Sequence, residues 1–173
     1  MKNIKNIILI GMPGAGKSTT GVILAKTLGY LFCDTDLILQ EIEGKKLQNL
    51  IDESGFDAFK EAEEKAVAET LKRFKERTVV ATGGSVVYSS DSMKLLKESG
   101  IVIYLKVGLS ELKRRIKNIR VRGIAGRPGQ SFESLMEERS KLYEKYADFT
   151  IEGEKNTIEE NVEKIIDILN IKY

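Results

Sequence analysis

The residues with the clearest chemical potential form one segment near the start of the chain, Gly11-Met12-Pro13-Gly14-Ala15-Gly16-Lys17-Ser18. It fits the pattern G-x-x-x-x-G-K-[ST], in which glycines let backbone N–H groups turn toward a phosphate and the following helix adds partial positive charge. An apolar stretch precedes it, and an amphipathic stretch with Val22, Ile23, Ala25 and Leu28 follows. A glycine-rich turn that matched this pattern by chance would need neither the apolar stretch before it nor the amphipathic stretch after it. We therefore expect a nucleotide phosphate site (a P-loop) formed by Gly14, Ala15, Gly16, Lys17, Ser18 and Thr19.

Two side chains of this segment have expected tasks. Lys17 should bridge the β- and γ-phosphates of the nucleotide, and the Ser18 hydroxyl should ligate the accompanying Mg²⁺. The segment says nothing about the molecule that would receive a phosphoryl group.

Two aspartates one residue apart follow the next β-like stretch, in Phe32-Cys33-Asp34-Thr35-Asp36. Ligands of open α/β sheets gather at the ends of such strands. One carboxylate could reach magnesium through water while the other meets the hydroxyl of an acceptor. The simpler alternative is a helix N-cap at Asp36, which stands directly before the apolar residues 37–39. Next to a phosphate site, we favour the functional interpretation.

The stretch RVRGIAGRPGQS, residues 120–131, contains three arginines interleaved with three glycines and a proline. Loops of this length in a compact domain frequently serve as active-site lids. We expect a mobile basic lid over about residues 120–131. The alternative is a solvated surface connection.

Short β-like runs alternate with helical stretches along the chain, which predicts an α/β fold of three layers with a parallel sheet between helices. The five expected strands are Asn6–Ile10, Tyr30–Asp34, Thr78–Thr82, Ile101–Leu105 and Asp148–Ile151. The expected helices are Ser18–Leu28, Asp36–Glu43, Leu47–Glu53, Phe56–Phe74, Ser110–Ile119, Phe132–Tyr146 and Thr157–Asn170. In Phe56–Phe74 a spacing near 3.6 residues links Phe59, Ala62, Ala66, Val67, Thr70, Leu71 and Phe74.

Composition predicts one globular domain over residues 1–173. The 28 basic and 26 acidic residues give a net charge of +2, too balanced for general affinity for nucleic acids or membrane surfaces. The single cysteine, Cys33, forms no intramolecular disulfide, and no apolar run approaches the length of a membrane span. We expect a cytoplasmic monomer with no nucleic-acid or membrane partner. With no histidine in the chain, proton acceptors must be carboxylates, lysines or water.

Taken in order, these motifs resemble those of the shikimate kinase family over essentially the full length of the chain. The matching segments are Gly11–Ser18, Asp34-Thr35-Asp36, Phe59-Lys60-Glu61-Ala62-Glu63, Gly83-Gly84-Ser85, the arginine-containing loop, Glu138-Arg139, Leu142-Tyr143 and Ala147-Asp148. The resemblance implies a nucleoside-monophosphate-kinase-like fold with a five-stranded parallel sheet. It implies ATP with Mg²⁺, and a small hydroxy acid as acceptor. That acceptor would be shikimate, phosphorylated to shikimate 3-phosphate in aromatic amino-acid (chorismate) biosynthesis.

The resemblance also implies roles for individual residues. Asp34 would join Ser18 in holding magnesium, and Asp36 would orient or deprotonate the acceptor hydroxyl. Helices over about residues 36–74 would bind the acceptor, helped by the backbone of Gly83 and Gly84 and by the side chains of Lys60 and Arg139. Arg122 would close over the transferring phosphate as a catalytic residue, and Arg115 would lie near the adenine.

Three positions depart from the family's pattern. The family usually has an arginine where Lys60 stands, and lysine keeps the charge but loses the planar two-pronged geometry. The family's three-glycine run reads Gly83-Gly84-Ser85 here, and Arg122 is followed by glycine and isoleucine where proline is common. Because two of these changes are on the acceptor side and one is in the lid, an alternative hypothesis is an intact ATP site with a different acceptor.

Other functions remain open from the sequence. One is a related small-metabolite kinase acting on a sugar acid such as gluconate. Nucleoside monophosphate kinases share the P-loop, but the two aspartates together with Arg139 suit a small acid better. The other is a non-catalytic ATP-binding module that regulates a partner. Such a module would be expected to lose Lys17, Ser18 and the two aspartates, all of which are present.

Overall fold

The computed structural model describes residues 6–116, 124–154 and 156–171. Five strands form one sheet in the order β2-β3-β1-β4-β5, and each neighbouring pair is parallel. The strands are β1 Asn6–Ile10, β2 Leu31–Asp34, β3 Thr78–Ala81, β4 Gly100–Lys106 and β5 Phe149–Glu152. The predicted parallel sheet is confirmed, with strand bounds within two residues of those expected. Strands β1 and β3 are buried at every position, as central parallel strands covered on both faces should be.

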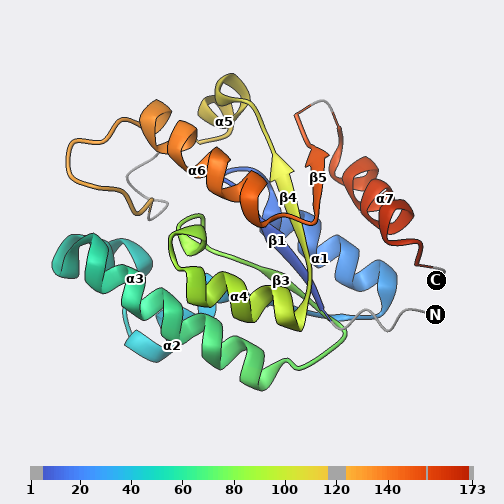
Figure 1. Ribbon diagram of the computed structural model, residues 1–173, viewed down its shortest axis with the longest axis horizontal. Coiled ribbons are helices and arrows are strands. Elements are labelled where there is room, and N and C mark those ends of the chain that lie inside the picture. The colour runs from blue at the N-terminus through green and yellow to red at the C-terminus, as the bar shows by residue number, and fades with distance from the viewer. Residues whose placement is uncertain (1–5, 117–123, 155, 172–173) are drawn as a thin grey trace.

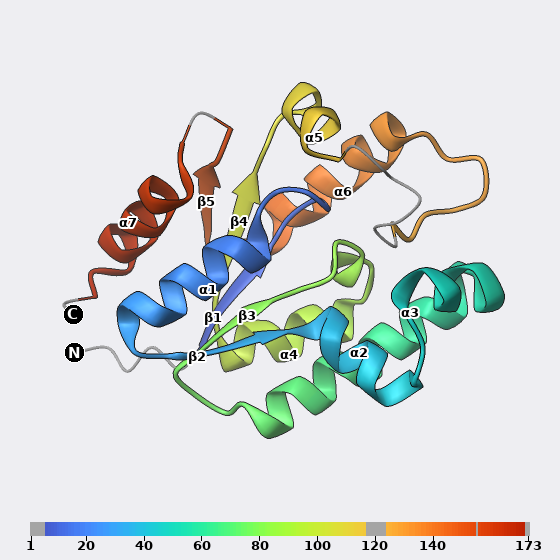
Figure 2. The same ribbon diagram turned by 180° about the vertical axis from the view of Figure 1, so that it is seen from behind.

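Helices cover both faces of the sheet. They are α1 Lys17–Leu28, α2 Thr35–Glu43, α3 Leu47–Arg73, α4 Ser90–Ser99, α5 Leu109–Arg115, α6 Phe132–Tyr146 and α7 Ile158–Leu169, with a short 3₁₀ turn η1 at Val86–Tyr88. Helices α1 and α7 lie together on one face, and α4 and α6 lie on the other with α3 packed against α4 (Figures 1 and 2). This is the three-layer arrangement that the alternating pattern predicted.

Helix α4 was not predicted. The polar run Ser89-Ser90-Asp91-Ser92 has the composition of a loop, and only Met93 and Leu96 of the helix are buried apolar residues. Nevertheless, the Ser89 hydroxyl accepts from the backbone N–H of Ser92 at 3.1 Å, so Ser89 is an N-cap. A serine four residues before an i, i+3 apolar pair was the signal that could have located this helix.

Helix α3 bends sharply at Gly55, whose φ of 75° and ψ of 177° are not helical. The two expected helices, Leu47–Glu53 and Phe56–Phe74, are therefore confirmed as two parts of one bent element. Helix α5 ends earlier than expected, because Ile116 has φ −95° and ψ 76°. The remaining predicted residues of that helix, 117–119, lie outside the described residues.

The buried face of α1 includes only two of the four apolar residues that marked the amphipathic stretch, Ala25 and Leu28. Val22 and Ile23 are 47% and 36% exposed, whereas Leu24, Ala25 and Leu28 are buried. Lys17, Gly21, Leu24 and Leu28 follow one another at three- or four-residue steps and therefore share the face of α1 that packs on the sheet. Val22 lies beside that face.

The core has two parts. A large cluster surrounds the central strands, and a smaller one joins α2, α3 and the segment before α6 through Cys33, Ile38, Leu39, Leu50, Phe59, Ala66 and Ala125. Ala125 belongs to the expected lid, and here it is 3% exposed and packed in the smaller cluster. The mobility of the lid stays a prediction, since residues 117–123 lie outside the described part.

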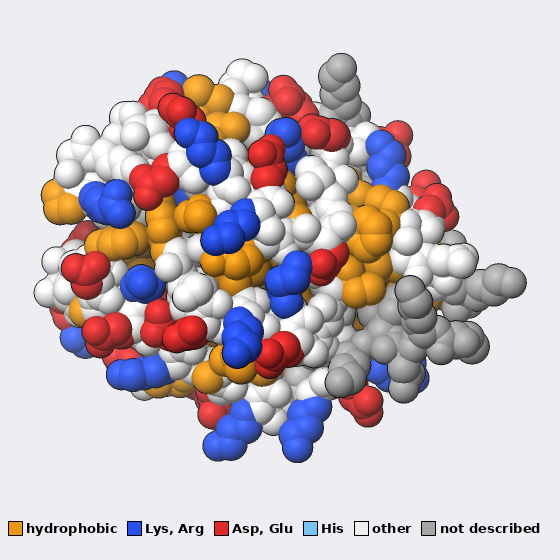
Figure 3. Space-filling view, in the orientation of Figure 1, with side chains coloured by type: hydrophobic (Ala, Val, Ile, Leu, Met, Phe, Trp, Pro, Cys, Tyr) orange, Lys and Arg blue, Asp and Glu red, His pale blue; other side chains and the backbone are white. Residues whose placement is uncertain are grey.

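The surface in Figure 3 shows acidic and basic side chains interspersed. Within the described ranges, no helix combines the length and apolarity needed to cross a bilayer.

Candidate active site

The P-loop connects β1 to α1 at the carboxyl edge of the sheet, where β1 lies between β3 and β4. Open α/β sheets bind ligands at such a point because neighbouring loops diverge there and leave a crevice. Gly14 turns the loop with φ 83°, and a side chain at this position would approach Ile116 Cγ1 to 2.8 Å. Both conditions require glycine.

The Lys17 ammonium group lies across the loop. Its Nζ donates to the backbone carbonyls of Gly11 at 2.8 Å and Met12 at 3.0 Å, and the residue is 8% exposed. Burial lowers the pKa of Lys17 to about 8, while Asp36 and Asp34 act in the opposite direction. The cation is thus held at the phosphate site by neutral carbonyls, with no described carboxylate in an ion pair with it.

Asp34 performs two tasks at once. Its Oδ2 accepts from the Ser18 hydroxyl at 2.6 Å, and its Oδ1 accepts from the backbone N–H of Asp36 at 3.0 Å. The second contact makes Asp34 the N-cap of α2, so the alternative that placed the cap at Asp36 was two residues too late. The same side chain therefore fixes the start of α2 and faces the phosphate site.

The Ser18 and Asp34 oxygens fit a magnesium ion that arrives with nucleotide phosphates. Mg²⁺ favours oxygen ligands and is commonly held by one or two protein oxygens plus phosphates and water. In the described part of the chain no group of three or more acidic, cysteine or histidine side chains forms a cage of its own. A site that relies on the nucleotide's oxygens agrees with that finding.

A pair of carboxyl groups stands at the opposite end of the crevice. Asp36 comes from the first turn of α2 and Glu63 from α3, and they flank Gly83. A β-carbon on Gly83 would overlap Glu63 Oε1 and lie 2.7 Å from Asp36 Oδ1, so any larger residue there would have to displace both carboxyl groups. Burial, followed by the neighbouring Asp34 charge, raises the pKa of Asp36 to about 6.

Arg139 of α6 brings a buried cation to the same end. It is 1% exposed, its guanidinium lies 5.2 Å from the ring centre of Tyr88, and it donates to the carbonyl of Ala125. Among the described residues it forms no ion pair. A buried guanidinium without a carboxylate partner is costly unless an anion is supplied from outside.

Tyr143 of α6 stands between the P-loop and the loop that contains Gly84. Its hydroxyl donates to the carbonyl of Gly84 and lies 3.8 Å from Met12 Sδ, and its ring is 5.0 Å from that of Tyr104. Burial raises the pKa of Tyr143, so the hydroxyl remains a donor throughout the physiological range.

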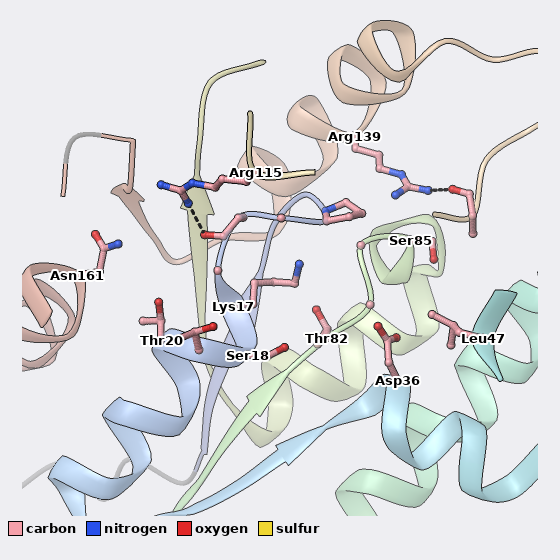
Figure 4. A pocket seen from close by; sticks show the side chains of 18 of the residues that line it. Lys17, Ser18, Thr20, Asp36, Leu47, Thr82, Ser85, Arg115, Arg139 and Asn161 are labelled. Atoms are coloured by element: carbon pink, nitrogen blue, oxygen red, sulfur yellow. Dashed lines mark hydrogen bonds between the residues drawn. The ribbon is translucent and has the colours of Figure 1, made fainter. Parts of the chain in front are cut away.

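One cavity of about 540 Å³, a size suited to small ligands, joins the P-loop with its Lys17 and Ser18 to Asp36, Glu63 and Arg139. Figure 4 shows Lys17 and Ser18 in its centre, Asp36, Ser85 and Arg139 at one end, and Thr20, Arg115 and Asn161 toward the other. The lining residues are Pro13, Gly14, Ala15, Gly16, Lys17, Ser18, Thr19, Thr20, Asp36, Leu47, Phe59, Glu63, Thr82, Gly83, Gly84, Ser85, Arg115, Ala125, Arg139, Asn156, Thr157, Ile158 and Asn161.

Most sequence-predicted site residues line this cavity. Asp34 does not, but its contact with Ser18 places it at the edge. Of the two glycines expected to meet the acceptor, Gly83 already donates its N–H to Thr35 Oγ1 at 3.1 Å. The N–H of Gly84 has no partner among the described residues. Arg115 donates to Glu111 at 2.6 Å and to the Ala15 carbonyl of the P-loop at 3.5 Å, and its expected place near the adenine stays a prediction.

One predicted residue of the described part of the chain is not brought to the cavity. Lys60 does not line it, and its Nζ lies 4.0 Å from Glu64 Oε1 on the same helix. Arg122 lies outside the described residues. The roles expected of Lys60 and Arg122 stay predictions.

Sequence reasoning missed Glu63 and the two asparagines. Glu63 lies four residues after Phe59 and three before Ala66, so a charged residue on the apolar stripe of α3 was the available signal. Asn156 donates to Asn161 Oδ1 at 2.9 Å, and Lys164 donates to Asn156 Oδ1 at 2.8 Å. No pattern in the sequence separates these asparagines from ordinary residues near a helix start.

A P-loop with its lysine and serine, joined by one cavity to an aspartate and a buried arginine, defines a small-molecule P-loop kinase. The family model for shikimate kinase matches residues 13–170. A shikimate kinase from Sulfurihydrogenibium sp. (strain YO3AOP1) is 36% identical over 163 residues, 94% of this chain and 96% of that protein. One from Thermodesulfovibrio yellowstonii is 36% identical over 165 residues and 94% of each chain.

Solved structures agree with this assignment. The structure of shikimate kinase from Acinetobacter baumannii in complex with shikimate superposes with a TM-score of 0.88 and 28% identity, over 98% of this chain and 94% of that one. The chain belongs to the shikimate kinase family.

Proposed function

We propose that this protein transfers the γ-phosphoryl group of ATP to a hydroxyl of shikimate, giving shikimate 3-phosphate. The observation that carries the proposal is Arg139, a buried cation without a described acidic partner. It opens on the same cavity as the P-loop and Asp36. A small acceptor that is both an anion and an alcohol would satisfy Arg139 with its carboxylate and Asp36 with its hydroxyl. The shikimate-bound relative with the same fold supports this choice of acceptor.

The residues act mainly by positioning and by offsetting charge, which is what phosphoryl transfer requires. The backbone of the P-loop and the ammonium group of Lys17 bind the β- and γ-phosphates. When bound, Mg²⁺ would offset further phosphate charge, and Ser18 and Asp34 would hold it. Asp36 orients the attacking hydroxyl and accepts its proton. A carboxyl whose pKa is about 6 is ionised at neutral pH and is more basic than an ordinary aspartate.

The remaining parts of the proposal concern the surroundings. Arg115 and the segment 156–161 lie at the end of the cavity away from Asp36, which supports placing the nucleoside there. We include Arg122 as the lid residue that neutralises charge on the transferring phosphate, and a loop over about residues 120–131 that excludes water. We propose a monomer that works in the cytoplasm, where ATP is available.

The test is ADP release measured with purified protein, MgATP and one acceptor at a time. We expect turnover with shikimate well above the rate without acceptor, and little or none with gluconate or other sugar acids. If gluconate is turned over faster than shikimate, the acceptor is wrong although the kinase class holds. If ATP binds but no acceptor raises ADP release, the protein is a nucleotide-binding regulator and the proposal fails.

A further inference from the structure

Tyr88 is a tyrosine that the proposed function leaves without a task, although it lies directly against Arg139. It belongs to η1, is half-buried and does not line the cavity. The guanidinium carbon of Arg139 lies 5.2 Å from the centre of its ring. The face of an aromatic ring carries partial negative charge, so this contact stabilises the cation. Tyr88 therefore touches Arg139 without bordering the space in which an acceptor would bind.

The aromatic contact stabilises the buried cation without neutralising it. A carboxylate in the place of the ring would form an ion pair with Arg139, and an incoming anion would have to compete with that pair. The ring of Tyr88 and the carbonyl of Ala125, to which Arg139 donates, offer only partial charges. The bond to Ala125 is the dashed line beside Arg139 in Figure 4. The guanidinium therefore keeps its full charge for an anion that the ligand supplies.

The contacts of Arg139 leave one arm of its guanidinium at the acceptor end. Nη2 donates to the Ala125 carbonyl, and Nε donates to the Tyr88 hydroxyl over a long 3.5 Å. In the described part of the chain Nη1 has no hydrogen-bond partner, and a β-carbon on Gly84 would lie 3.1 Å from it. Nη1 is therefore the donor that remains for an acceptor carboxylate, and the two other contacts set where it stands.

Tyr88 is itself held from two sides. Its backbone N–H donates to the Ser85 carbonyl at 3.0 Å, and the next residue, Ser89, is the N-cap of α4. The ring of Phe56, which follows the bend of α3 at Gly55, meets the Tyr88 ring with centres 5.5 Å apart and planes at 85°. Such an edge-to-face arrangement is a favoured geometry of aromatic pairs. The position of the Tyr88 ring is thus fixed both by the loop that carries Gly84 and by α3.

Resting on the proposed function, we propose that Tyr88 is a positioning residue that holds the Arg139 guanidinium in the orientation that receives the carboxylate of shikimate. The edge of the Phe56 ring supports Tyr88 in this task. Tyr88 acts through Arg139 and makes no contact with the acceptor. Without the ring, the long side chain of Arg139 would gain further rotamers, and part of the free energy of binding the carboxylate would be lost in ordering it again.

Steady-state kinetics with shikimate and ATP varied in turn, each at saturating concentration of the other, test this proposal. Tyr88→Leu removes the ring, so KM for shikimate should rise about tenfold, with KM for ATP unchanged and kcat within about twofold. Tyr88→Phe keeps the ring and loses only the long hydroxyl contact, so its KM for shikimate should stay within about twofold of the wild-type value. A Tyr88→Phe protein as impaired as Tyr88→Leu would overturn the proposal, because the ring would then not be the group that acts.

Tyr30→Leu is the matched control. Tyr30 is also half-buried, and the guanidinium carbon of Arg77 lies 5.3 Å from the centre of its ring. These two residues precede β2 and β3, so the pair lies at the amino edge of the sheet, away from the cavity. Tyr30→Leu should therefore leave both KM values unchanged. A similar rise in KM for shikimate in Tyr30→Leu and Tyr88→Leu would mean a general disturbance of the fold and would overturn the proposal.

A measurement without substrate ties the effect to Arg139 and separates this inference from the proposed function. Urea titrations give the free energy of unfolding of the wild type, Tyr88→Leu, Arg139→Met and the double variant. Tyr88→Leu should lower this free energy more in the wild type than in Arg139→Met, since the second protein has already lost the shared contact. Equal lowering in both backgrounds would overturn the proposal. Unequal lowering together with no turnover of shikimate would overturn only the proposed function.

Discussion

The two ends of the cavity are built in different ways. At the nucleotide end, one continuous segment supplies the phosphate site through its backbone, and Lys17 is held by two carbonyls of that same segment. At the acceptor end, Asp36, Glu63, Ser85 and Arg139 come from four separate parts of the chain. Three of these four are ionisable, and their charges depend on one another. The phosphate site can therefore be predicted from eight consecutive residues, whereas the groups of the acceptor end come together only when the chain folds.

This difference predicts that damage to the nucleotide end affects every reaction, and damage to the acceptor end affects the acceptor alone. The largest effect should come from Lys17→Ala, which removes the cation at the β- and γ-phosphates. We expect kcat/KM for ATP to fall by about 10³-fold with any acceptor. Thermal unfolding should be compared in parallel, because the variant also loses the contacts to Gly11 and Met12. A rise in KM for shikimate with kcat/KM for ATP unchanged would contradict the division into two ends.

Asp36→Asn should have the next largest effect. The amide keeps the size of the side chain but accepts no proton from the attacking hydroxyl, and we expect kcat to fall by about 10²-fold. Calorimetry should find ADP binding close to that of the wild type. If kcat is unchanged, Asp36 has no part in activating the hydroxyl. If ADP binding is lost as well, the two ends are not separable.

Arg139→Lys should weaken binding of the acceptor specifically. Lysine keeps the positive charge but loses the planar fork that grips a carboxylate with two hydrogen bonds. We expect KM for shikimate to rise by about tenfold, with KM for ATP unchanged. An equal rise in both constants would mean that the substitution disturbs α6 and not a local contact.

The smallest effect is expected for Lys60→Arg. Lys60 is partly exposed and faces Glu64, so its contribution in this conformation is that of a surface charge. Arginine could reach further and fork onto a carboxylate, so KM for shikimate should stay the same or fall, within about threefold. A large increase in KM would show that Lys60 turns into the cavity when the acceptor binds and that its ammonium group fits there.

The fold was predictable where the sequence pattern and tertiary packing agree. Five apolar runs became the five parallel strands, and the glycine at position 55 divided α3 where two helices were expected. Prediction failed where a few residues carry the information. Helix α4 buries only two apolar side chains under a polar start, and the outward position of Val22 follows from a helical register that composition does not reveal.

The site was predictable to the extent that it is local. The P-loop and the aspartates of the β2–α2 junction are motifs with a fixed geometry. Glu63 was missed because a glutamate among helix residues usually faces water, and only its burial between Asp36 and Ser85 gives it a different chemistry. The role that the family pattern implies for Lys60 stays a prediction, because its side chain lies near Glu64 and does not line the cavity.

The hydroxyl of Tyr143 has a further consequence, since it touches the loop of Gly84 on one side and Met12 of the P-loop on the other. Through these two contacts a side chain of a third element, α6, sets how the Gly84 loop and the P-loop lie relative to each other. Removing the phenol oxygen, as in Tyr143→Phe, would remove both contacts and with them the link that α6 makes between the two loops.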